Sequence, residues 1–282
     1  MTHLPFKQVD VFTAVPYSGN PVAVIFDAES LSGEAMQRIA RWTNLSETVF
    51  ITAPTQDGAD YRARIFTPKS ELPFAGHPTL GAAHAVLEAG RATLHSGHIV
   101  QECGVGLVRL HRAAKDARLF FEVPPARLTD LDTGAIDAVS RAASVPLLGQ
   151  AVIVDLGPRW LTAEVASIHE LLAARPDFAA IAKLSSDLKI SGINLFARDA
   201  TDTEVRSFAP ASGIDEDPVC GSGNAAVAIV LRNRGASTAY RARQGRCIGR
   251  DGYIEVEFSE NGPIRLGGDT LTCVEGRLAL PH

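Results

Sequence analysis

The chain has 282 residues, of which 46% are hydrophobic and 21% are charged, the proportions of an ordinary soluble globular protein. Its 27 Lys and Arg against 32 Asp and Glu give a net charge of −5, and no run of basic residues occurs, so we expect no nucleic-acid partner. No apolar stretch approaches the roughly 18 residues of a membrane-spanning helix, so no membrane partner is expected either. At about 150 residues per domain, the length favours two domains.

The predicted elements alternate irregularly between strands and helices. Short β-branched or alternating runs in the N-terminal quarter predict strands over 6–13, 21–27, 48–52 and 61–67. Helical spacing predicts a helix over 31–43, and amphipathic outer helices are predicted over 133–143 and 167–174. Near the C-terminus, Asp251-Gly252 and Asn261-Gly262 are hairpin signals. This mixture favours an α+β fold over a doubly wound parallel sheet.

Two predicted helices differ from the amphipathic ones. Residues 78–87 and 224–231 carry no formally charged side chain. A helix that is apolar all round is a buried helix, so each is expected to be a central rod wrapped by strands. Gly90 and Gly235 follow where a left-handed residue would end each helix.

The segments that precede these helices resemble each other. Arg64-Ile-Phe-Thr-Pro-Lys-Ser70 resembles Arg206-Ser-Phe-Ala-Pro-Ala-Ser212 at an offset of 142, and Pro73-Phe-Ala-Gly76 matches Pro218-Val-Cys-Gly221 at an offset of 145. The offset is about half the chain length, which predicts two similar halves produced by duplication. Pro124-Pro125 interrupts any strand or helix, so we place the halves at 1–124 and 125–282, with a return of the last strand to the first half kept open.

The loop before each buried helix is the first candidate site. His77 precedes Pro78 near the predicted N-cap, and the glycines of Cys220-Gly-Ser-Gly-Asn224 let backbone N–H groups approach a ligand closely. Helix starts carry unpaired N–H donors and a partial positive charge, so both loops suit a carboxylate or phosphate. Two such starts facing one cleft would hold an anionic small molecule. Simple capping is the alternative for each loop alone, and the repetition favours function.

Two acidic residues are candidates for proton transfer. Asp217 lies five residues before Ser222 across a restricted loop, a spacing that would direct both side chains into one pocket; a solvated turn is the alternative. Glu47 lies between the end of a predicted helix and an apolar strand, where partial burial would raise its pKa and suit it as a general base. An exposed position at the start of that strand is the alternative for Glu47.

The remaining motifs predict neither a cofactor nor a metal. Gly221-x-Gly-x-x-Ala226 formally matches a dinucleotide-binding pattern, but the preceding strand ends near Phe208 and no clear acidic partner follows. His95 and His98 form the only close histidine pair and lack a carboxylate or thiol cluster.

Five sequence blocks resemble the phenazine biosynthesis PhzF family. They are Val9-Asp-Val-Phe-Thr13, Gly19-Asn-Pro-Val-Ala-Val24, Asn44-Leu-Ser-Glu-Thr48, Pro73-Phe-Ala-Gly-His-Pro-Thr79 and Asp217-Pro-Val-Cys-Gly-Ser222. They occur in the order of the family and cover the chain from Val9 to about Leu231. The resemblance implies a diaminopimelate-epimerase-like fold, in which two similar α/β domains related by a pseudo-two-fold duplication each wrap a mixed sheet around a central buried helix.

The resemblance also implies an isomerase that needs no cofactor and no metal. The best-known member of the family shifts a proton within trans-2,3-dihydro-3-hydroxyanthranilate. Carried over to this chain, Glu47 would remove the proton and return it to another carbon, while His77, Asp217 and Ser222 would orient the substrate and assist proton relay. The residues implied to bind substrate are Gly76, Gly221, Cys220 and Gly223.

Two other functions stay open. Racemases and epimerases with this fold use one thiol from each half, and here Cys220 occupies the second-half position at a helix start that would favour the thiolate. The first-half position is Ala75, so only a single-thiol epimerase or racemase, with Cys220 paired to Glu47 or His77, is available. Cys220 as a small packed residue is the alternative. A non-catalytic small-molecule-binding protein is the third possibility.

The cysteines and the N-terminus bear on location and partners. The four cysteines are widely spaced, with no Cys-x-x-Cys pair, which predicts reduced thiols and a cytoplasmic protein. The first ten residues contain no basic segment followed by an apolar stretch, so no signal peptide is expected. As partners we expect a small carboxylate substrate and, from the resemblance, a second copy of the chain in a homodimer.

Overall fold

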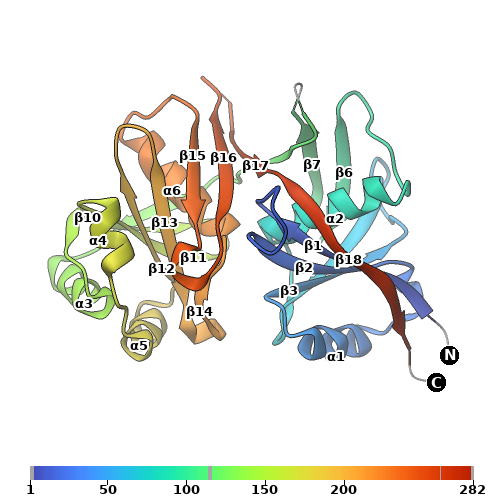
Figure 1. Cartoon of the computed structure of the whole chain (residues 1–282), viewed down its shortest axis with the longest axis horizontal. Coiled ribbons are helices and arrows are strands. Elements are labelled where there is room, and N and C mark those ends of the chain that lie inside the picture. Colours follow the sequence, from blue (N-terminus) through green and yellow to red (C-terminus); the bar gives the residue numbers. More distant parts are fainter. Residues whose placement is uncertain (1–2, 114–115, 261, 281–282) are drawn as a thin grey trace. The chain divides into compact units, whose positions relative to one another are not determined.

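The computed structural model describes residues 3–113, 116–260 and 262–280, and the chain forms two compact units. Unit 1 comprises Met1–Glu122 and Gly267–His282, and unit 2 comprises Val123–Leu266. Strand β18 (Thr270–Ala279) pairs antiparallel with β1 (His3–Val11), which explains why the C-terminal segment belongs to unit 1. Each unit consists of a mixed sheet with a few helices, as expected for the α+β class (Figure 1).

In unit 1 the strands pair in the order β18–β1–β2–β3–β4–β6–β7–β8. The pairs β2–β3 and β4–β6 are parallel, and the others in this order are antiparallel. The short strand β5 also pairs with β4. The bounds are β2 (Asn20–Ile25), β3 (Glu47–Thr52), β4 (Tyr61–Phe66), β5 (Glu71–Leu72), β6 (His98–Cys103), β7 (Gly106–Arg112), β8 (Leu119–Glu122), α1 (Gly33–Thr43), α2 (Gly76–Glu88) and a 3-10 turn at Ala28–Ser30.

In unit 2 the strands pair in the order β9–β10–β11–β12–β13–β15–β16, with β14 on β13. The pairs β11–β12 and β13–β15 are parallel and the others antiparallel. The bounds are β9 (Arg127–Asp130), β10 (Leu147–Asp155), β11 (Arg159–Val165), β12 (Gly192–Arg198), β13 (Thr203–Ala209), β14 (Ile214–Asp217), β15 (Tyr240–Gln244), β16 (Gly252–Phe258), α3 (Thr133–Ala143), α4 (Ile168–Ala173), α5 (Phe178–Leu188), α6 (Gly221–Asn233) and 3-10 turns at Pro210–Ser212 and Arg246–Ile248. Strand β17 (Ile264–Gly268) includes the last residues of unit 2 and the first residues of the C-terminal segment of unit 1. The two units thus share one pattern of parallel and antiparallel pairs.

The strand register supports the duplication residue by residue. Phe66 and Phe208 are equivalent in the sequence repeat; Phe66 pairs with Thr48, and Phe208 pairs with Ile193. Strands β3 and β12 are therefore counterparts at an offset of 145. Helices α2 and α6 have 13 residues each and start at the same offset. One supersecondary arrangement has been used twice in the chain.

The two uncharged helices are buried, as predicted. Helix α2 packs against β1, β2, β3, β4, β6, β8 and β18, and α6 packs against β10, β11, β12 and β16. Gly90 has φ +64° and Gly235 has φ +93°, and in both cases the N–H of the next residue donates to the carbonyl five residues earlier. These are the left-handed C-terminal caps that the glycines indicated.

The amphipathic helices lie outside the sheets, where Figure 1 shows α1, α3 and α5 at the periphery of their units. Helix α1 begins at Gly33, two residues later than predicted, because Ser32 is its N-cap and accepts a hydrogen bond from the N–H of Ala35. Helix α5 was not predicted. With α3 and α4 it covers an apolar core that includes Val139, Ile153, Leu161, Leu171, Ile181, Leu195 and Phe208.

One predicted turn is wrong and one cannot be followed. Gln244 pairs with Gly252, so β15 and β16 are joined by residues 245–251, which include a 3-10 turn, rather than by a two-residue turn at Asp251-Gly252. Gly252 is glycine for a packing reason, since a Cβ there would lie against the side chain of Val219. The second hairpin signal includes Asn261, which lies outside the described residues.

Within the described ranges, no helix combines the length and the apolar character needed to cross a membrane.

Candidate active site

In unit 1 the structure brings Glu47 and His77 together. Glu47 is the first residue of β3, and His77 is the second residue of α2. The N-cap of α2 is Ala75, so the predicted N-cap position of His77 is wrong by two residues. Glu47 Oε2 lies 3.3 Å from His77 Nε2, and the side chains are 13% and 6% exposed, respectively. A carboxylate and an imidazole in contact and largely shielded from water are suited to proton transfer.

The imidazole of His77 is neutral near pH 7, because burial lowers its pKa to about 3. Its Nδ1 lies 3.4 Å from the amide nitrogen of Asn20, and that nitrogen can only donate. The Oδ1 of Asn20 accepts a hydrogen bond from Ser46 Oγ at 3.3 Å, which sets the orientation of the amide. Nδ1 of His77 therefore accepts, and the single ring proton resides on Nε2, facing Glu47.

Gly76 allows a close approach at the start of α2. A Cβ at this position would lie 2.8 Å from Cζ of Phe121. The N–H of Thr79 donates to the carbonyl of Ala75 and begins the helical ladder. The N–H groups of Gly76 and His77 precede that ladder at the positive end of the helix dipole, where an anionic group is favoured.

In unit 2 the structure brings Asp217, Cys220 and Ser222 together. Asp217 ends β14, Cys220 is the N-cap of α6, and Ser222 is the second residue of that helix. The Cys220 thiol donates to the Asp217 carboxylate, and Cys220 Sγ lies 3.6 Å from Ser222 Oγ. Burial raises the pKa of Asp217 to about 6, although hydrogen bonds from the N–H of Val219 and from the thiol partly offset this effect.

The two glycines of this loop have different surroundings. Gly221 is the first residue of α6 and is buried. Gly223 donates its N–H to Cys220 Sγ at 3.2 Å, and its carbonyl accepts from Nδ2 of Asn194 at 2.7 Å. A Cβ at Gly223 would lie 2.7 Å from Oγ of Ser207. These contacts give Gly223 a packing role, and its contact with substrate stays a prediction.

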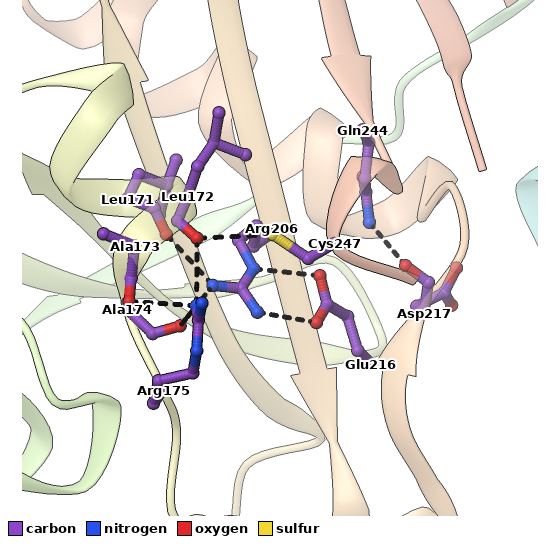
Figure 2. A network of polar contacts seen from close by, with 10 residues as sticks. All are labelled: Leu171, Leu172, Ala173, Ala174, Arg175, Arg206, Glu216, Asp217, Gln244 and Cys247. Atoms are coloured by element: carbon purple, nitrogen blue, oxygen red, sulfur yellow. Dashed lines mark hydrogen bonds and ion pairs between the residues drawn. The ribbon is translucent and has the colours of Figure 1, made fainter. Parts of the chain in front are cut away.

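Gln244 and Trp160 were missed by the sequence analysis. Gln244 is buried, and its Oε1 accepts from the Cys220 N–H and from the Asn224 amide. Its Nε2 donates to the Asp217 carbonyl at 2.9 Å (Figure 2). Trp160 Nε1 donates to Ser222 Oγ at 2.9 Å. Both residues lie on strands whose sequences carry no motif, so only the tertiary structure reveals them.

A buried ion pair anchors the strand that carries Asp217. Figure 2 shows the Arg206 guanidinium between the Glu216 carboxylate and the end of α4. Nη2 of Arg206 lies 2.8 Å from Oε2 of Glu216, and the two side chains are 5% and 4% exposed. Nη1 donates to the carbonyls of Leu171 and Ala174, both at 3.0 Å. These bonds fix β14 directly before the loop to α6.

Among the residues that the structure describes, no three or more His, Cys, Asp or Glu side chains are grouped to hold a metal ion.

Comparison with known proteins agrees with this architecture. The sequence model of the PhzC-PhzF family, described as phenazine biosynthesis-like protein, matches residues 9–276. The chain belongs to this family. Antisense-enhancing sequence 1 of Schizosaccharomyces pombe is 39% identical, over 98% of this chain and 99% of that protein. The trans-2,3-dihydro-3-hydroxyanthranilate isomerase of Pseudomonas aeruginosa is 34% identical, over 98% of this chain and 99% of that protein.

A solved structure gives the same result for the fold. The PhzF family phenazine biosynthesis protein of Enterococcus faecalis superimposes with a TM-score of 0.84 at 26% identity, covering 99% of this chain and 100% of that one. The resemblance inferred from the five sequence blocks and the α+β fold are thus confirmed. This PhzF family member is an isomerase.

Proposed function

We propose that this protein moves a proton within a small carboxylate substrate of the trans-2,3-dihydro-3-hydroxyanthranilate type, without a cofactor and with Glu47 as general acid and base. The observation that carries the proposal is the largely buried contact between Glu47 Oε2 and His77 Nε2. The isomerase of Pseudomonas aeruginosa that matches nearly the whole chain supports this substrate class.

In this reaction Glu47 takes a proton from one carbon of the substrate and returns it to another carbon, so no atom is gained or lost. The neutral imidazole of His77 places its Nε2–H 3.3 Å from the carboxylate and helps to shield that carboxylate from solvent. The position in unit 2 that corresponds to Glu47, at an offset of 145, is Gly192. The repeat supplies no second carboxylate at this position, which supports a single group acting first as base and then as acid.

Asp217 and Ser222 are assigned supporting roles in the same reaction. The pKa of Asp217 lies near 6, so both of its protonation states are accessible near neutral pH, as a proton relay requires. The Ser222 hydroxyl and the N–H groups of Gly76 and Gly221 lie at helix starts and suit an anionic or carbonyl oxygen of the substrate. Cys220 contributes through its contacts with Asp217 and Ser222.

Proton NMR in D₂O with trans-2,3-dihydro-3-hydroxyanthranilate tests the proposal. The wild type should isomerise the substrate with incorporation of deuterium, and Glu47→Gln should lower kcat by about 10²–10⁴-fold, the range expected for loss of a general base. Glu34→Gln, an exposed acid in the first turn of α1, is the matched control and should keep full activity. Turnover that survives in Glu47→Gln would refute Glu47 as the base.

A single-thiol epimerase or racemase is the second candidate. The observation that favours it is the position of Cys220, whose Sγ caps α6, accepts the N–H of Gly223 and contacts Asp217. This candidate predicts solvent exchange at the α-carbon of an amino acid, abolished in Cys220→Ala. Full activity of Cys220→Ala would exclude it. Binding of a small carboxylate without any proton exchange would instead favour a non-catalytic binding protein.

A further inference from the structure

The hydrogen bond between Trp160 and Ser222 restricts what the serine hydroxyl can do. Nε1 of Trp160 lies 2.9 Å from Ser222 Oγ, and Trp160 is 4% exposed. An indole N–H is a donor only. Ser222 Oγ therefore accepts from Trp160, and its own proton must be directed to a different group.

In unit 2 the carbonyl oxygen of Phe208 and the Trp160 ring together leave no room for a side chain at Gly192, since a Cβ there would lie 2.1 Å from that oxygen. His77 and Ser222 are each the second residue of their buried helix. In unit 1 the residue that faces this position is Glu47, an acceptor. In unit 2 its counterpart is Gly192, which pairs with Trp160 on the neighbouring strand, and a Cβ at Gly192 would lie 2.8 Å from Cζ3 of the indole. In unit 2 the second helix residue, Ser222, thus contacts a donor, the Trp160 indole, whereas in unit 1 the second helix residue, His77, contacts an acceptor, the Glu47 carboxylate.

We propose that Trp160 is a positioning residue that fixes Ser222 as a hydrogen-bond donor toward an oxygen of the substrate. The proposal rests on the proposed function, in which Ser222 contacts substrate. In the structure Ser222 Oγ also lies 3.6 Å from Cys220 Sγ, and a thiol sulfur is a weak acceptor. A carboxylate or carbonyl oxygen would take that proton in its place, whereas a substrate ammonium, which can only donate, would not.

The contacts beyond Ser222 run in the same direction. Trp160 donates to Ser222, Ser222 can donate to Cys220, and the Cys220 thiol donates to Asp217. Because Trp160 cannot accept, the Ser222 proton points away from the indole, and Cys220 Sγ, whose own proton goes to Asp217, can accept it. Loss of Trp160 would let the Ser222 hydroxyl rotate and would remove the preference for an oxygen acceptor.

NMR of the indole N–H groups tests the contact without requiring activity. The protein has two tryptophans, and Trp42, which is 77% exposed, provides an internal reference. In Ser222→Ala the Nε1–H signal of Trp160 should move upfield and exchange faster with solvent, while that of Trp42 should stay unchanged. An unchanged Trp160 signal would overturn the inference. The indole remains in place in this variant, so the measurement does not depend on a change in the packed ring.

A double-mutant cycle tests the role of Trp160 in the reaction. With trans-2,3-dihydro-3-hydroxyanthranilate, Trp160→Phe should lower kcat/KM by about 3- to 10-fold, the value of one hydrogen bond. In the Ser222→Ala background the same change should have no further effect, since Trp160 acts through that hydroxyl. Trp42→Phe is the matched control. If the double variant loses kcat/KM by the product of the two single-variant losses, the two residues act independently and the inference is overturned. A wild type that turns over none of this substrate would refute the proposed function, and the indole signal would still decide the contact.

Discussion

Protonation of His77 should couple the stability of the protein to pH. The folded protein holds the pKa of His77 at about 3, whereas a histidine in an unfolded chain titrates near 6.5. The unfolded state therefore binds the proton at higher pH. The contribution of this residue to the free energy of unfolding is fully present above about pH 6.5 and is lost as the pH falls from there toward 3. Between pH 7 and pH 5 the loss amounts to about 2 kcal/mol.

Urea unfolding of wild type and His77→Gln at several pH values measures this coupling. The stability of the wild type relative to the variant should fall by about 2 kcal/mol between pH 7 and pH 5, because the variant has no group to protonate. His95→Gln, which replaces an exposed histidine, should keep the pH dependence of the wild type. Ring-carbon shifts showing that His77 titrates near neutral pH in the folded protein would contradict this prediction, and so would a His77→Gln variant with the same pH slope as the wild type.

Three further predictions concern charge and hydrogen bonding. Burial raises the pKa of Asp217 to about 6, so the folded state binds the carboxyl proton more tightly than the unfolded state. The free energy of unfolding should therefore fall as the pH rises from about 4 to 6. Asp217→Asn should lack this pH dependence in the same urea series. Arg206→Gln leaves a buried carboxylate unpaired and should cost about 3–5 kcal/mol. The equivalent change in the more exposed pair, Arg64→Gln, should cost no more than about 1 kcal/mol in the same assay. Asn20→Ala removes the donor to Nδ1 of His77, so ¹⁵N shifts of the ring should report a mixture of tautomers instead of the Nε2–H form alone.

The parts of the fold that were predicted are those for which burial leaves a local mark on the sequence. A helix without charged side chains must be surrounded, and a glycine that follows it ends it, so α2 and α6 could be placed within a few residues. The repeat was detectable because each helix is preceded by a strand and a loop with the same residue types. The turn between β15 and β16 was wrongly placed at Asp251-Gly252 because Gly252 is required for packing against Val219, and the sequence alone does not distinguish that need from a turn.

The parts of the site that were missed depend on contacts distant in sequence. Trp160 and Ser222 are 62 residues apart, and Asn20 and His77 are 57 apart. In the parallel pairs β2–β3 and β11–β12, Val22 lies beside Glu47 and Trp160 beside Gly192, and the local sequence does not specify these pairings. Asn20 lies within one of the blocks that carry the family resemblance, so the sequence did contain a motif that could have indicated Asn20 as a site residue. Trp160 lies in a strand with no such block.

The two units of the duplicated scaffold carry different acid–base groups. Both units have the helix start and its N–H donors, but the candidate catalytic side chains around it differ between the units. Glu47 corresponds to Gly192, Leu72 to Asp217, Ala75 to Cys220 and His77 to Ser222. Unit 1 therefore has a carboxylate with a neutral imidazole and no thiol, and unit 2 has an acid, a thiol and a hydroxyl held by an indole. Neither unit contains the partner that a mechanism with two equivalent thiols or two equivalent carboxylates would need, so the proposed proton transfer is asymmetric.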